Sequence, residues 1–230
     1  MQEYTVICPN CKSAVPIGYP ICPYCGFDLR PIIRFKAKQE LTKYDILMRV
    51  KKALIRPWEI HKEIALAEDS LGPFIIALLL AFIFAIRLLI TSSNIGLLAG
   101  LAIKDLGIFF FMSFFVSMAL MLLIWLVLSI VANLIFKLLG AKTNFPLTRC
   151  MVGYSLAIVI PFLLVNTIIL ALSTSELDII NNAMIARMIM FSGMILFVAF
   201  LSEGASKTYF INRILVFIIF LPIISTPYFV

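Results

Sequence analysis

The chain has 230 residues, of which 63% are hydrophobic and only 13% are charged, and its mean hydropathy is +1.09. A soluble domain carries about 25% charged residues, so these values exclude an ordinary water-soluble fold and predict that lipid covers most of the apolar surface. The formal net charge of +7 is typical of a membrane protein whose cytoplasmic loops face anionic headgroups, and a nucleic-acid partner is not expected.

The N-terminal thirty residues hold four cysteines in two CxxC pairs, Cys8 with Cys11 and Cys22 with Cys25. They lack the uninterrupted apolar stretch of a signal peptide. Two residues between thiolates allow one tight turn to direct both sulfurs at one ion, and two such turns complete a tetrahedral Zn(II) site. The pattern therefore predicts a zinc ribbon over residues 1–29, with a structural zinc ion.

Two alternatives to zinc are disulfides and a redox CxxC motif. A reducing cytoplasm disfavours disulfides, and the βαβ pattern that accompanies a thioredoxin-like motif is absent from this sequence. The ten-residue spacer between the pairs is long enough for a hairpin, whose turn is expected near residues 17–20. Cys150 is left over and is expected to be a small buried residue.

Residues 30–71 are expected to connect the ribbon to the membrane. Arg30, Arg34, Lys36 and Lys38 form a basic stretch that suits anionic headgroups. Two short amphipathic helices follow, separated by Pro57, and they are expected either to lie on the cytoplasmic leaflet or to pack against the cytoplasmic loops of the bundle. His61 lies among charged residues and is expected to be exposed to solvent.

Charge-free stretches predict an all-α polytopic membrane bundle of about five transmembrane helices in residues 72–230. Apolar segments of roughly 20 residues are long enough to cross the bilayer core. The predicted spans are 73–91, 107–136, 147–173, 183–202 and 212–229.

Basic residues predict the orientation of these spans. With the N terminus in the cytoplasm and the C terminus outside the cell membrane, 16 Lys and Arg residues lie on the cytoplasmic side and 2 on the outer side. This asymmetry follows the positive-inside rule.

Polar groups inside the spans are candidates for function, and the clearest are Asn133 and Asn166. Both can also be explained as hydrogen-bonding groups between helices. A nucleophile–base set, a catalytic metal motif and a phosphate loop were not found in the sequence, so an enzyme is not expected. Small residues four apart, at 113 and 117 and at 96 and 100, are compatible with a homo-oligomer.

Two segments carry distinctive motifs. The first is the amphipathic helix that begins at Pro57 and leads into Asp69-Ser70-Leu71-Gly72-Pro73. The second is Gly153-Tyr154-Ser155-Leu156 followed by Pro161, after an entry at 139–145. Both segments and this entry resemble the Yip domain of the Yip/Yif membrane proteins. The resemblance covers about residues 46–230, and it departs from the eukaryotic form at Leu71, where a tyrosine is usual.

The resemblance implies a non-enzymatic integral membrane protein whose motif residues are Asp69, Gly72, Pro73, Gly153, Tyr154, Ser155 and Pro161. Eukaryotic relatives are tied to vesicle traffic and Rab-type GTPases, a role that does not transfer to a cell without such vesicles. The cysteine head lies outside the family domain, and the combination of head and domain resembles a prokaryotic member of the family.

The expected function is that of a membrane-organising or adaptor protein, which binds a cytoplasmic protein through residues 1–40. The alternative is a small transporter or channel component, with the third helix kinked at Pro161 and lining a polar path.

Overall fold

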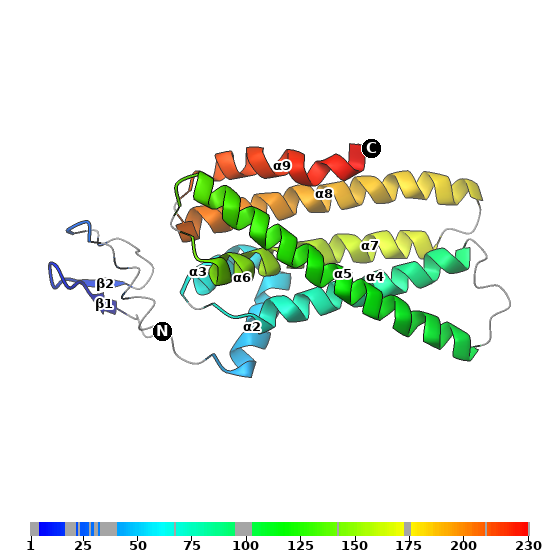
Figure 1. Ribbon diagram of the computed structural model, residues 1–230, viewed down its shortest axis with the longest axis horizontal. Helices are drawn as coiled ribbons and strands as arrows, with labels where there is room; N and C mark the ends of the chain where they lie inside the picture. The colour runs from blue at the N-terminus through cyan, green and yellow to red at the C-terminus, as the bar shows by residue number, and fades with distance from the viewer. Residues whose placement is uncertain are drawn as a thin grey trace.

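The structure is a computed structural model, and most of it is helical (Figure 1). It describes residues 5–16, 22, 24–27, 29, 32, 41–66, 68–94, 103–141, 143–172, 176–209 and 211–229.

The cysteine head contains a short antiparallel hairpin of β1 (Thr5–Ile7) and β2 (Ala14–Pro16), in which Val6 pairs with Val15. The first CxxC pair forms the turn of this hairpin, because it lies between the two strands. The turn expected at residues 17–20 lies outside the described residues. The small core of the head consists of Val6, Val15, Leu29, Cys8 and Cys22.

Two short helices precede the bundle. Helix α2 (Lys43–Ile55) begins with a capping box between Thr42 and Asp45, and α3 (Pro57–Leu66) begins at the proline that separates the two. One face of α2, with Ile46, Val50 and Ala53, is buried. Both helices pack against the bundle: α2 against α4 and α3 against α8. The inner faces of both helices are thus buried against helices of the bundle.

The bundle consists of α4 (Leu71–Asn94), α5 (Ile103–Leu138), α6 (Phe145–Ser155), α7 (Val159–Ala171), α8 (Glu176–Tyr209) and α9 (Arg213–Phe229). The segments 71–93, 105–138, 145–171 and 184–209 are long and apolar enough to cross a membrane. Helix α9 is shorter, at 17 residues, and runs beside α8. Helix α8 is longer at both ends than the predicted span 183–202.

The third span is interrupted. A single 3-10 turn, η1 (Leu156–Ile158), separates α6 from α7 directly before Pro161. Proline lacks an amide hydrogen and its ring excludes regular α geometry one turn earlier, which explains why the irregular turn lies at this position.

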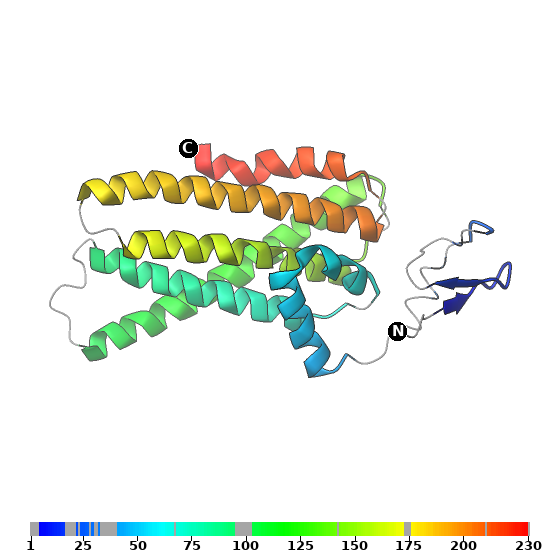
Figure 2. The same ribbon diagram turned by 180° about the vertical axis from the view of Figure 1, so that it is seen from behind.

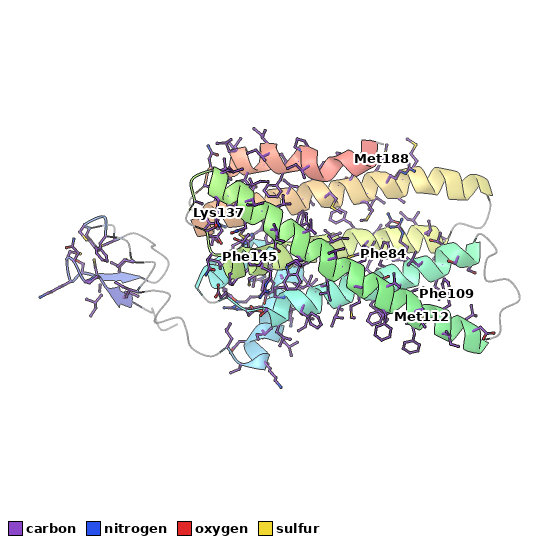
Figure 3. The ribbon with its side chains drawn as sticks, viewed as in Figure 1. Phe84, Phe109, Met112, Lys137, Phe145 and Met188 are labelled. Carbon is purple, nitrogen blue, oxygen red and sulfur yellow. The ribbon has the colours of Figure 1, made fainter. Side chains whose placement is uncertain are left out.

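The third span also forms the centre of the bundle. Every residue from Cys150 to Ile160 is buried, and α6 contacts α3, α4, α5 and α8. In contrast, α5 crosses the outside of the bundle, and Met112 on α5 and Met188 on α8 lie on the outer surface (Figure 3). Lipid-facing side chains thus surround a core that is centred on α6.

Candidate functional site

Two knuckles of the same conformation hold the four cysteines. In the first, the Lys12 amide donates to the Cys8 carbonyl at 2.8 Å, and in the second the Gly26 amide donates to the Cys22 carbonyl at 2.9 Å. Lys12 and Gly26 both take a positive φ, of 59° and 72°. Glycine adopts this left-handed region without strain, whereas lysine does so at a cost in free energy. The positive φ of Lys12 therefore indicates that the tight turn after Cys11 is imposed by the fold of the head.

The four thiols have the geometry of a metal site. The sulfurs of Cys8, Cys11, Cys22 and Cys25 all lie within 4.8 Å of one another, and the Cys8–Cys25 and Cys11–Cys22 pairs are each 3.5 Å apart. A tetrahedron with Zn–S bonds of about 2.3 Å separates its sulfurs by about 3.8 Å. Hydrogen bonds with Ser13 lower the pKa of the Cys11 thiol to about 6, whereas burial raises the pKa of its neighbour Cys22 to about 11. The described residues therefore fit a Zn(II) ion with four sulfur ligands.

A buried charged cluster lies where the chain enters the first span. We call Arg49, Asp69 and Tyr154 the boundary cluster. Arg49 Nη1 donates to Asp69 Oδ2 at 3.2 Å, and the Tyr154 hydroxyl donates to the same oxygen at 2.9 Å. The side chains of Arg49 and Asp69 are only 8% and 4% exposed. The cluster joins three parts of the protein: α2 holds Arg49, the short segment before α4 holds Asp69, and α6 holds Tyr154. Arg49 and Tyr154 are far apart in the chain.

The boundary cluster is completed by local hydrogen bonds. Asp69 Oδ1 accepts from the Gly72 amide at 2.8 Å, which satisfies an otherwise unpaired donor at the start of α4. Arg49 Nη2 donates to the Glu63 carbonyl at 3.2 Å, and the Glu63 carboxylate pairs with Lys52. A buried ion pair is stable only when such additional hydrogen bonds are present, and here they are.

Two glycines allow α4 and α6 to approach closely. A Cβ at Gly72 would lie 1.9 Å from the Tyr154 hydroxyl oxygen, and one at Gly153 would lie 2.3 Å from Pro73 Cβ. The Trp125 indole also lies at this contact and donates to the Arg149 carbonyl at 2.9 Å. Five of the seven family-motif residues, namely Asp69, Gly72, Pro73, Gly153 and Tyr154, are therefore brought together.

We expect Gly72→Ala to lower the free energy of unfolding of the detergent-solubilised protein by about 1–3 kcal/mol, because the new methyl group overlaps the buried Tyr154 hydroxyl. The melting temperature should fall accordingly. Gly107→Ala on α5 is the matched control, since a Cβ there meets no atom within 4 Å. It should be neutral or stabilising. Equal melting temperatures for the two variants would contradict the close contact.

The other two motif residues lie away from the boundary cluster. The Ser155 hydroxyl donates to the Met151 carbonyl at 2.8 Å within the same helix, and Pro161 is exposed on α7. Their positions, on either side of η1, indicate a role in the break of the third span.

The two predicted intramembrane asparagines have different surroundings. Asn133 accepts a long hydrogen bond from Thr148 at 3.4 Å, and Thr148 in turn shares a 2.8 Å hydrogen bond with Tyr209. Asn166 donates to the Ala186 carbonyl at 2.9 Å, whereas its Oδ1 has no hydrogen-bond partner among the described residues. Asn133 thus belongs to a polar network, while Asn166 retains a buried, unsatisfied acceptor.

The expectation that His61 is exposed is wrong. His61 is fully buried, and its ring lies against Phe200 with the centroids 4.0 Å apart. A Cβ at Gly204 would lie 2.6 Å from the imidazole, so this glycine makes room for the ring. Burial, together with the nearby Lys207 ammonium, lowers the His61 pKa to about 4, although the Phe200 carbonyl and Glu203 act in the opposite direction.

We expect α3 to detach from α8 as the pH falls. His61 binds a proton near pH 6.5 when α3 is released and only near pH 4 when α3 is packed, so packing is fully stable above pH 6.5 and weakens progressively down to pH 4. The difference between these two pKa values corresponds to about 3 kcal/mol of free energy that packing of α3 loses at low pH. Hydrogen exchange of the α3 amides, corrected for the intrinsic rate at each pH, measures the effect. His61→Phe should abolish the pH dependence, and an unchanged profile in this variant would refute the mechanism.

Arg49 and Trp125 were missed by sequence reasoning. Arg49 lies in a basic segment together with Lys43, Lys51 and Lys52, and Trp125 lies within a long apolar stretch. The available signal was the position of Arg49 on the helical face of Ile46 and Ala53, one turn from each.

The comparisons with known proteins support the family resemblance. The model of the Yip1 domain family matches residues 51–229, which is more than three quarters of the chain. The chain matches no curated protein and no solved structure at a significant level.

Proposed function

The chain belongs to the Yip1 domain family, and from this we propose that it is a non-enzymatic membrane-organising adaptor. In this proposal a zinc-bound head faces the cytoplasm and binds a cytoplasmic protein through residues 1–40. The transmembrane domain anchors the head, with the N terminus inside and the C terminus outside.

The boundary cluster is the observation that carries the proposal. An adaptor must hold its cytoplasmic part in a defined position relative to its membrane anchor. The cluster fixes α2, which follows the residues that lead from the head, onto α4 and α6 by a buried ion pair and a shared carboxylate. We infer that these buried charged groups hold α2 in one geometry, because a displacement would leave a buried charge without its partner.

The proposed structural zinc supports the same role. Four protein ligands leave no open position for a substrate, so a site with four cysteine ligands stabilises a small domain and does not catalyse a reaction. Among the described residues of the head, five side chains form a buried core, which is too small to fold without additional stabilisation.

Crosslinking and affinity capture from native membranes test the adaptor role. We expect a defined cytoplasmic protein to be captured by the intact chain and lost both when residues 1–40 are removed and in Cys8→Ser. Cys150→Ser is the matched control, because it removes a buried cysteine of the bundle and leaves the head intact. Capture that is equal for all variants would contradict a partner site on the head.

The second candidate is a small transporter or channel component. The buried, unsatisfied Asn166 Oδ1 and the break at η1 favour it, since both are features of polar paths through membranes. Solute flux into reconstituted vesicles that is lost in Asn166→Leu and retained in Cys8→Ser would select this candidate over the adaptor.

A further inference from the structure

Helix α2 is apolar on two sides. Ile46, Val50 and Ala53 are buried against the bundle. On roughly the opposite side, Leu47 is 56% exposed and Ile55 is 65% exposed. A helix at the surface of a soluble domain carries polar residues on its outer side, so the second apolar face needs a partner. Its exposed apolar members are Tyr44, Leu47, Met48, Leu54 and Ile55.

The position of α2 relative to the membrane follows from the boundary cluster. Arg49, in the middle of α2, binds Asp69, and Asp69 directly precedes the first membrane-spanning segment at Leu71. The middle of α2 therefore lies at the depth where the chain enters the bilayer. Figures 1 and 2 show α2 running across the long axis of the bundle at this level, which is the direction of the membrane plane.

The charge of the outer face suits the same environment. Lys51 lies in the middle of the exposed apolar sector, and Lys43 borders it, whereas Asp45 lies on a different side of the helix. Lysines in this position extend their ammonium groups toward phosphates while their methylene stems contact acyl chains.

We propose that the outer face of α2 inserts into the headgroup region of the same membrane and binds anionic phospholipid. The helix then acts as an interfacial wedge of 13 residues beside the bundle, held at a fixed depth by Arg49. The proposal does not depend on the adaptor role, because it rests on the placement of α2 alone.

Photo-crosslinking in vesicles tests the proposal. A benzophenone amino acid in place of Leu47 or Ile55, in the full chain reconstituted into phospholipid vesicles, should yield lipid adducts detectable by mass spectrometry. Phe115 is the positive control, since it is 57% exposed on α5, and Glu59 is an exposed polar control on α3. We expect yields at 47 and 55 to be close to that at 115 and several-fold above that at 59. Yields at 47 and 55 as low as at 59, or adducts to a second protein chain in place of lipid, would overturn the proposal.

The lipid preference is tested with two vesicle compositions. Adduct yields at position 47 should be several-fold higher in vesicles containing phosphatidylglycerol than in phosphatidylcholine alone, and Lys51→Gln should remove most of this difference. Lys137→Gln is the matched control, because Lys137 is an exposed lysine at the end of α5 and not on α2. Equal adduct yields in the two vesicle compositions for the chain that keeps Lys51 would refute the preference for anionic lipid.

Discussion

Asp69→Ala should lower the free energy of unfolding of the transmembrane domain by about 3–5 kcal/mol, because the Arg49 guanidinium would stay buried without its carboxylate. The variant also removes the acceptor of the Tyr154 hydroxyl and the cap of the Gly72 amide. Thermal unfolding in detergent, followed by the loss of the monodisperse form, measures the effect.

Two further variants determine whether the loss comes from the unpaired charge. Asp69→Ala combined with Arg49→Met removes both charges, so much of the stability should return. Glu203→Ala breaks partly exposed ion pairs with Lys207 and Arg213 and should cost at most about 1 kcal/mol. Additive losses in the double variant would mean that Arg49 and Asp69 do not interact.

Removal of zinc should unfold the head and leave the bundle intact. Structural Zn(II) sites of this kind contribute about 10–16 kcal/mol of apparent binding free energy, far more than the five buried side chains of the described part of the head supply. We expect a strong chelator to render residues 5–29 sensitive to protease, while the melting temperature of the transmembrane domain is unchanged. The bound metal is measured by elemental analysis of the purified chain.

Cysteine variants provide the control for zinc. Cys22→Ser removes one of the most buried ligands and should abolish zinc binding, whereas Cys150→Ser should retain a full complement of zinc. A head that resists protease equally with and without chelator would show that metal does not stabilise it. Restored protection after zinc is returned would distinguish unfolding from damage.

The membrane class could be predicted from the sequence because it depends on local composition. Long uncharged stretches leave no alternative to lipid, and the structure contains helices at each of them. The cysteine site was also predictable, since two CxxC pairs specify their ligands by spacing alone. Its fit to a metal ion is supported by the sulfur distances, while zinc itself remains a prediction.

The boundary cluster could not be predicted from the residues alone. Arg49 and Asp69 are 20 residues apart, and Asp69 and Tyr154 are 85 apart. Hydrophobic periodicity gives the faces of a helix but not its partner, so the contact between α2 and α6 has no local signal. The family motifs named Asp69 and Tyr154 without indicating that they touch each other.

His61 illustrates a different limit. The flanking Lys62 and Glu63 suggested a solvated position, but a helical residue shares its face with neighbours three and four positions away, and Ile64 is buried. Space for the ring is provided by Gly204, which lies on α8 near the other end of the chain. A glycine in an apolar helix gives no indication of which side chain will occupy the space beside it.

The buried centre of the third span bears on how this span enters the membrane. Every residue from 150 to 160 is buried by the rest of the protein, and Thr148 and Arg149 directly precede this segment and insert poorly into lipid on their own. Its surroundings are provided first by α4 and α5, which are synthesised earlier, and then by α8, which follows. Because of this order along the chain, the third span is synthesised when α4 and α5 are already available to pack against it. Helix α8 then covers its remaining surface.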